Sequence, residues 1–407
     1  MTNAGPERPA LEVAEVIREH GAAFLTRHGG WLTGVQQKAL RDLARCRTAA
    51  LGGHVERCAD CAYERISYNS CRNRHCPKCQ AQARARWLDR QAQNLLPVDY
   101  YHVVFTLPKE VAELALANPA VMYDLLFQAA SSTLREVAAN PKRLGALPGV
   151  LLVLHTWGQN LHHHPHVHGV VTGGGLSCDA QGALDESPRW VACRPGFFLP
   201  VRVLSRVFRG KYLDLLRRQH DRGELVFPGR LVPLADATTF VRWLSPLYAK
   251  DWVVYAKRPF GGPKQVLKYL ARYTHRVAIS NRRLVKLEEG KVTFRYKDYA
   301  EKQRPKCLTL TAEEFLRRFV QHVLPKHFMK IRHYGLLANR GREPLLTLCR
   351  RLLFAATVGN ALPDARTPEV VIEPARVRCC PECGSHRLIV RELPRHSQPI
   401  VRPSDTS

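Results

Sequence analysis

His162-His163-His164-Pro165-His166-Val167-His168, followed by Gly169-Val170-Val171-Thr172, is the stretch that decides the expected fold. The β-branched residues after the histidines predict a strand over 166–172. Alternate residues of a strand point to the same face, so His166 and His168 should converge while Val167 faces a core. Two convergent imidazoles can bind a divalent metal. The alternative is a histidine-rich surface loop without a ligand.

Charge and composition narrow the class of partner. The chain has 407 residues, which suggests two or three domains, and 62 Lys+Arg against 35 Asp+Glu give a net charge of +27. This excess favours nucleic acid as the partner. A membrane fits poorly, because there is no long apolar run, no basic amphipathic anchor and no secretory signal. The 13 cysteines are concentrated in CxxC pairs, which indicates metal thiolates in a reducing cytoplasm.

Hydrophobic periodicity predicts a mixture of strands and helices. The predicted strands are 101–107, 150–157, 166–172 and 252–257, with a hairpin near 278–286 and 291–298. The predicted helices lie within 10–50, 81–96, 109–139, 201–221, 236–248 and 311–357, and one more runs from Pro263 to about 277. The segment 173–185 is rich in turn residues. The tail after 360 is Pro-rich and polar, so it is expected to be mobile except at Cys379-Cys380-Pro-Glu-Cys383.

Two CxxC pairs near the N-terminus have the spacing of a zinc ribbon. Cys58-x2-Cys61 and Cys76-x2-Cys79 each offer two thiolates, and two such turns complete a tetrahedral Zn²⁺ site. Sequence leaves Cys71 and His75 open as alternative ligands. A third pair, Cys380-x2-Cys383, is half a site that Cys379, His386 or His396 could complete.

The ribbon is also basic. Its candidates for phosphate contact are Arg72, Arg74 and Lys78. The alternative for these charges is a solvated surface.

Two tyrosines recur at helical spacing after Pro263. Tyr269 and Tyr273 are four residues apart and share a face of the expected helix. The neighbouring DNA-binding candidates are Lys268, Arg272 and Arg276. A phenol has a pKa near 10 and becomes a useful nucleophile only beside a cation or metal. The alternative is a pair of packing aromatics, but a metal site and a zinc ribbon upstream favour a reactive role.

At this point the chain resembles the rolling-circle HUH transposases, bacterial insertion-sequence enzymes with an N-terminal zinc ribbon and a two-tyrosine nuclease. The matching motifs keep their order along the chain over roughly residues 35–340. They are Cys71-Arg-Asn-Arg-His-Cys-Pro-Lys-Cys79, Tyr101-His-Val-Val-Phe-Thr-Leu-Pro108, His155-Thr-Trp-Gly-Gln159, His164-Pro-His-Val-His168, Tyr269-Leu-Ala-Arg-Tyr273 and Ile279-Ser-Asn-Arg-Arg-Leu284.

The resemblance implies roles for several of these residues. His166-Val167-His168 would be the histidine–hydrophobic–histidine motif, and Tyr269 and Tyr273 would be the nucleophiles. Related nucleases often have a third metal ligand; the candidates here are His155, Gln159 and His164. Some relatives work with one tyrosine, so the need for both stays open.

The resemblance also implies an α+β fold. Its centre would be an antiparallel sheet of four or five strands with helices on one face, preceded by the zinc ribbon and followed by C-terminal helices. The expected domains are a helical and zinc-ribbon part (1–95), a nuclease (96–305, with an insertion near 173–250), a helical region (306–360) and a flexible tail (361–407).

The expected activity is strand transfer on single-stranded DNA at the element ends and the target. Mg²⁺ or Mn²⁺ would polarise the scissile phosphate, and a tyrosine would form a 5′-phosphotyrosine and free a 3′-hydroxyl that can prime replication. No G-x4-GK[ST] loop is present, so a host helicase and the host replication machinery are expected partners in the bacterial cytoplasm, at the nucleoid. The alternatives are a plasmid rolling-circle replication initiator or relaxase, and a zinc-ribbon DNA-binding regulator without nicking activity.

Overall fold

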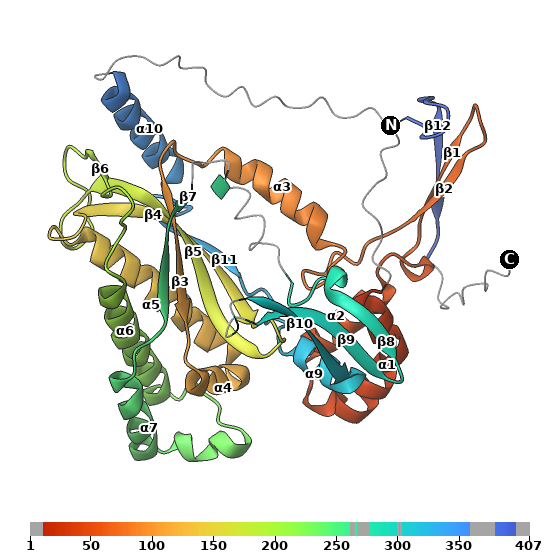
Figure 1. Cartoon of the computed structure of the whole chain (residues 1–407), viewed down its shortest axis with the longest axis horizontal. Helices are drawn as coiled ribbons and strands as arrows, with labels where there is room; N and C mark the ends of the chain where they lie inside the picture. Colours follow the sequence, from red (N-terminus) through yellow and green to blue (C-terminus); the bar gives the residue numbers. More distant parts are fainter. Residues whose placement is uncertain are drawn as a thin grey trace.

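A computed structural model describes residues 11–260, 265–266, 277–298, 301, 303–358 and 379–395. Three antiparallel sheets and their helices make up this part of the chain, as Figure 1 shows. Four short 3-10 helices cover Gly29–Trp31, Ala49–Leu51, Gly229–Ala235 and Asn281–Arg283. Within the described residues, no helix is long and apolar enough to cross a membrane.

The largest sheet lies at the centre of the molecule and has the order β11-β4-β5-β3-β7, with β6 paired to the far end of β5. Its strands are β3 (Tyr100–Thr106), β4 (Ala146–Trp157), β5 (His163–Ser177), β6 (Trp190–Ala192), β7 (Val254–Phe260) and β11 (Ile331–Gly335). The strands β4 and β5 form the central hairpin, as the apolar pattern of 150–157 and 166–172 predicts. This sheet confirms the expected α+β class.

The two faces of this sheet are covered differently. One face packs against α4 (Lys109–Ala117), α5 (Pro119–Ala139), α6 (Val201–Asp221) and α7 (Ala237–Ala249) in the largest core of the protein. Alternate side chains of the same strands, such as Leu151, Val153 and Val170, form a smaller core on the other face with α3 (Gln80–Ala92) and α10 (Arg342–Val358). The prediction places helices on one face of the sheet only. The structure has helices on both faces, four on one and α3 and α10 on the other.

A second packed unit combines the N-terminal helices with residues 284–320. The helices α1 (Val13–His28) and α2 (Gly34–Arg45) share a core with α9 (Ala312–Val320) and with the sheet β10-β9-β8. The strands of this sheet are β8 (Leu284–Glu288), β9 (Lys291–Asp298) and β10 (Arg304–Thr311). The side chains of Thr33 and Thr311 cap the N-termini of α2 and α9. Residues on both sides of the predicted domain boundaries at 95/96 and 305/306 therefore share the same hydrophobic cores.

The third sheet, which we call the zinc-domain sheet, has the order β12-β1-β2 and extends from the rest of the molecule in Figure 1. It consists of β1 (Gly53–Cys58), β2 (Glu64–Tyr68) and β12 (Leu388–Leu393). Its outer strand comes from the polar tail that the sequence suggests is mobile. For Leu388–Leu393 that expectation is wrong, because β12 pairs with β1 over six residues.

Among the other strands, β10 has no counterpart in the prediction from sequence. The strand β11 lies inside 311–357, where the sequence pattern predicts helix. Ile331-Arg-His-Tyr-Gly335 has weak alternation and no strong strand signal of its own. It becomes a strand because its backbone pairs with the exposed edge of β4, from Val153 to Gly149. Tertiary pairing here overrides local propensity.

Candidate functional site

Three histidines converge on the central hairpin. His155 of β4 lies directly opposite His166 of β5, and His168 is opposite Val153 on the same side of the hairpin. One ring nitrogen from each of the three lies within 4.8 Å of the others. The Nε2 atoms of His166 and His168 are 3.1 Å apart. This separation matches two nitrogens bound to one metal at about 2.1 Å each.

Hydrogen bonds orient the two rings of the β5 pair. His166 Nδ1 lies 2.7 Å from the backbone oxygen of His164, so its N–H donates there and Nε2 points to the centre. His168 Nδ1 lies 3.0 Å from Nε2 of His102 on β3. If the His168 Nδ1–H donates to His102, His168 Nε2 keeps its lone pair for a metal. Burial lowers the pKa of His102 to about 3, which keeps this imidazole neutral.

His155 is the most enclosed of the three. It is 2% exposed and stacks on Trp157 at 4.6 Å between ring centroids. We call His155, His166 and His168 the histidine centre. It offers three nitrogen ligands to a metal ion, whose remaining coordination positions would be open to water and substrate oxygens. This donor set fits Mn²⁺ or another transition ion better than Mg²⁺, which prefers oxygen ligands.

The other two candidates for the third ligand are outside the centre. His164 is exposed at the start of β5 and contributes its backbone carbonyl to His166. Gln159 lies in the turn after β4, where its carbonyl accepts a hydrogen bond from Arg283. Of the three alternatives, only His155 lies together with His166 and His168 in the structure.

The two tyrosines that the sequence singles out, Tyr269 and Tyr273, lie outside the described residues. The same holds for the basic candidates Lys268, Arg272 and Arg276.

The predicted zinc ligands belong to two clusters. Cys76 and Cys79 gather with Cys46 and Cys71 in what we call the first cysteine cluster. The Sγ atom of Cys46 is 3.6 Å from that of Cys79 and 3.5 Å from that of Cys76. Four sulfurs around Zn²⁺ at about 2.3 Å have this spacing. Hydrogen bonds from the thiols of Cys71 and Cys76 lower the pKa of Cys46 to about 7, which favours the thiolate that zinc needs.

Cys58 and Cys61 join the C-terminal pair instead, in what we call the second cysteine cluster. It consists of Cys58, Cys61, Cys380 and Cys383. The prediction of one ribbon from Cys58, Cys61, Cys76 and Cys79 is thus wrong in its pairing. The reason is that the β1–β2 hairpin takes Cys58 and Cys61 into the zinc-domain sheet, whereas Cys76 and Cys79 precede α3 next to the core of α1 and α2.

The other proposed ligands are also resolved by the structure. Cys71 is a member of the first cluster, while His75 Nε2 accepts a hydrogen bond from the Leu324 amide. Burial lowers the pKa of His75 to about 3, so this ring stays neutral. Neither Cys379 nor His386 belongs to the second cluster, and His396 lies outside the described residues.

The three basic candidates near the ribbon have different surroundings. Arg72 is exposed. The guanidinium of Arg74 donates to the backbone oxygens of Phe328 and Pro325 at 2.5 and 2.7 Å, and Lys78 forms an ion pair with Glu12. Arg74 and Lys78 therefore hold this part of the chain together, and of the three only Arg72 remains a candidate for phosphate contact.

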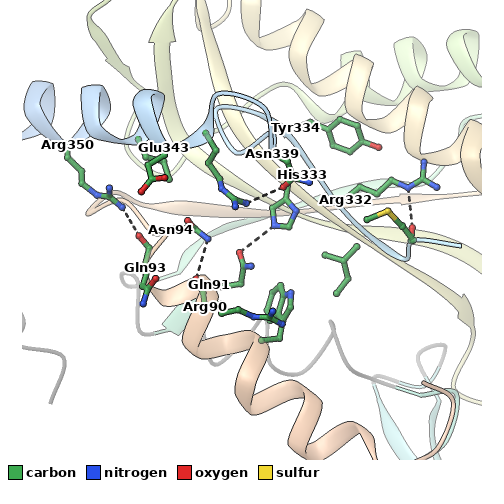
Figure 2. A pocket seen from close by; sticks show the side chains of 15 residues that line it. Arg90, Gln91, Gln93, Asn94, Arg332, His333, Tyr334, Asn339, Glu343 and Arg350 are labelled. Atoms are coloured by element: carbon green, nitrogen blue, oxygen red, sulfur yellow. Dashed lines mark hydrogen bonds between the residues drawn. The ribbon is translucent and has the colours of Figure 1, made fainter. Parts of the chain in front are cut away.

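A basic cavity of about 890 Å³ opens between α3, β11 and α10 (Figure 2). Its lining includes Arg90, Arg342, Arg350 and one acidic residue, Glu343, while a fourth lining arginine, Arg332, is ion-paired with Asp124. Arg350 Nη2 donates to the Gln93 carbonyl at 2.6 Å and so connects α10 to α3. His333, which also lines it, is opposite Leu151 on β4, and Leu151 and His155 share a strand face. The cavity and the histidine centre thus belong to the same face of the sheet.

Sequence reasoning missed Cys46, His102 and this cavity. Cys46 is an isolated cysteine 25 residues before Cys71, so spacing gives no signal for it. His102 could have been found, because it lies in the predicted strand 101–107, where alternation gives it a definite face. The cavity depends on β11, whose strand character only the tertiary pairing creates.

Comparisons with known proteins agree with this geometry. Residues 149–344 match the family model described as "Putative transposase", and residues 16–107 match the "Transposase zinc-binding domain". The first range contains the histidine centre, and the second contains the whole first cysteine cluster. No solved structure matches the chain significantly.

Two relatives extend over most of the chain. One is the "Putative transposase y4qJ" of Sinorhizobium fredii, 48% identical over 397 residues that cover 97% of this chain and 96% of the relative. The other is the transposase for insertion sequence element IS801 of Pseudomonas savastanoi pv. phaseolicola, 30% identical over 340 residues that cover 83% and 78%. The chain therefore belongs to the IS91-type transposases, a family of DNA-cleaving enzymes with a zinc-binding domain.

Proposed function

We propose that this transposase nicks and rejoins single-stranded DNA through tyrosine–5′-phosphate intermediates and thereby moves its insertion sequence by a rolling-circle mechanism. The observation that carries the proposal is the convergence of His155, His166 and His168 on one point of a rigid sheet. A regulator that only binds DNA has no use for three imidazoles oriented toward one point.

The histidine centre would hold a divalent ion, for which we propose Mn²⁺ ahead of Mg²⁺ because all three donors are nitrogens. A bound ion supplies Lewis-acid polarisation of a phosphate oxygen. The residues of the chain keep the ligands in place: His102 and the His164 carbonyl orient the two β5 rings, and Trp157 covers one side of His155.

Tyr269 and Tyr273 are the proposed nucleophiles. A phenolic oxygen attacks the scissile phosphorus, so that the Tyr O–P bond forms and the P–O3′ bond breaks. The phenol loses its proton to solvent, and the leaving 3′-oxygen gains one. The energy of the phosphodiester is kept in the covalent bond, so this chemistry needs no nucleotide cofactor. Strand separation would come from a host helicase together with host replication.

The basic cavity is the proposed path for the DNA strand. It combines arginines that attract phosphates with amide side chains from the end of α3 and the two residues that follow it, namely Gln91, Gln93 and Asn94. Along β4, Leu151 and His155 are four residues apart, roughly 13 Å at 3.3 Å per residue. A strand only a few nucleotides long can therefore occupy the cavity and reach the histidine centre.

The test is a covalent-adduct assay with the full chain. End-labelled single-stranded DNA from the ends of the element is incubated with Mn²⁺, and labelled protein is sought on a denaturing gel. The wild type should form the adduct, EDTA should prevent it, and Tyr269→Phe with Tyr273→Phe should abolish it while binding is retained. At least one of the single Phe variants should still form it. An adduct in the double variant would show that the nucleophile lies elsewhere.

The same DNA tests the strand path. Arg90→Gln with Arg342→Gln removes two charges of the cavity, and Arg86→Gln with Arg351→Gln removes two exposed charges of the same helices outside it. The first pair should weaken single-stranded DNA binding about 10-fold and reduce the salt slope by about 1.4, at roughly 0.7 per lost phosphate contact. Equal effects of both pairs would exclude the cavity as a specific path.

A further inference from the structure

The second cysteine cluster joins the two ends of the chain. Cys58 Sγ is 3.6 Å from Cys383 Sγ, and Cys61 Sγ is 3.5 Å from Cys380 Sγ, although these partners are 325 and 319 residues apart in sequence. The four sulfurs lie within 4.8 Å of one another. Four thiolates at about 2.3 Å from a tetrahedral Zn²⁺ are separated by about 3.8 Å. The spacing therefore fits one zinc ion at the centre.

The turns around these cysteines have the form of metal-binding knuckles. The backbone N–H of the residue two positions after the cysteine is hydrogen-bonded to the sulfur at Cys58, Cys61 and Cys383. The Asp60 amide, for instance, lies 3.4 Å from the Cys58 sulfur. Such N–H groups stabilise a thiolate, the form that binds a metal.

The backbone brings the two CxxC pairs together in a fixed register. Cys58 pairs with Leu388 at the end of the β1–β12 ladder, and the Ala59 amide donates to the Arg387 carbonyl at 2.9 Å. Asp60 accepts from the Ser385 hydroxyl and from Arg387 Nη1, the latter at 2.8 Å. One carboxylate therefore connects the β1–β2 turn to the chain directly after Cys383.

Among the residues that the structure describes, the zinc-domain sheet has no hydrophobic core that could hold this arrangement. Its largest apolar side chains are exposed: Ile66 is 52%, Ile389 50% and Val390 57% accessible. A sheet of three short strands without a buried face is not stable by itself in water. Small domains of this kind need a disulfide or a metal.

We propose that Cys58, Cys61, Cys380 and Cys383 form a second tetrathiolate zinc site, and that this site makes residues 379–395 a structural part of the N-terminal zinc-binding domain. Binding of Zn²⁺ displaces the thiol protons to solvent and leaves four thiolates on one ion. In the sequence, the central sheet of β3, β4, β5, β6, β7 and β11 then lies between the two halves of one zinc domain. Cys380 and Cys383 lie far outside residues 16–107, which match the zinc-binding family model.

A redox role fits these cysteines less well. In a redox CxxC motif the two sulfurs of one motif react with each other, whereas the pairs at 3.5 and 3.6 Å connect different motifs. These separations are also far from the roughly 2.05 Å of a disulfide.

The first experiment measures zinc in the full chain, purified under reducing conditions, by elemental analysis. Cys380→Ser with Cys383→Ser should contain one zinc ion per chain fewer than the wild type. Cys379→Ser is the matched control, because this exposed neighbour belongs to neither cluster, and it should keep the wild-type zinc content. An equal zinc content in the wild type and the double variant would overturn the proposal.

A second measurement needs no variant and is independent of folding defects. Cys61, Cys383 and Cys379 are all exposed, so they would be alkylated at similar rates if all were free thiols. With zinc bound, Cys61 and Cys383 should react with iodoacetamide at least about 10-fold more slowly than Cys379, and a chelator should remove the difference. Similar rates before chelation would contradict a metal at this site.

Discussion

The histidine centre and the second cysteine cluster both lie on antiparallel sheets, but packing supports them in opposite ways. Side chains of the central sheet are buried on both faces, and its ligands are neighbours in one hairpin. The zinc-domain sheet has exposed strands, and its ligands come from the two ends of the chain. By our proposals, the fold positions the metal ligands in the first region, whereas the metal holds the fold together in the second. Loss of ligands should therefore affect chemistry in one region and structure in the other.

The largest expected effect is on cleavage. His166→Ala with His168→Ala should reduce formation of the DNA adduct by about 10³-fold or more, because several kcal/mol of phosphate polarisation disappear. The free energy of unfolding should change by no more than about 1 kcal/mol, since both rings are only half-buried. Adduct formation and chemical denaturation measure the two quantities.

His162→Ala with His164→Ala is the matched control on the same segment. Both side chains are exposed and lie outside the histidine centre, so adduct formation should stay within a few-fold of the wild type. A loss as severe as that of the His166/His168 pair would return His164 to the list of ligands.

The next effect is structural and follows removal of zinc. A chelator should cause the amides of β1 and β12 to exchange with deuterium at rates close to those of loops, because the described part of the chain provides no buried core that would protect this sheet. The β4–β5 hairpin should retain its protection. Hydrogen exchange followed by mass spectrometry separates the two regions. If β1 and β12 stayed protected after complete zinc loss, the idea that metal holds this sheet would be wrong.

The smallest effect concerns a positioning residue. His102→Phe keeps an aromatic ring in β3 but removes the nitrogen that faces His168 Nδ1. Mn²⁺ affinity should fall about 10- to 100-fold, while cleavage at saturating Mn²⁺ should be nearly normal. His102→Gln, whose amide oxygen can accept the same hydrogen bond, should restore most of the affinity. A purely structural role for His102 would instead lower cleavage at every Mn²⁺ concentration and would show no rescue by Gln.

Local sequence patterns determine how the two β5 residues of the histidine centre converge. Alternation fixes the faces of His166 and His168, and the apolar runs at 150–157 and 166–172 predict two adjacent strands that differ from β4 and β5 mainly at their ends. Such patterns work here because strand periodicity and burial are properties of neighbouring residues.

Only the tertiary structure decided how the cysteines pair, which residue completes the histidine centre and where β11 belongs. The CxxC motifs show that thiolates bind metal, but a motif offers two ligands to any partner in reach, and no local rule connects Cys58 to Cys383 across 325 residues. The selection of His155 over Gln159 likewise depends on the register of the β4–β5 hairpin. Sequence specified the chemistry of each site through residue type, whereas long-range strand pairing decided which residues share a site.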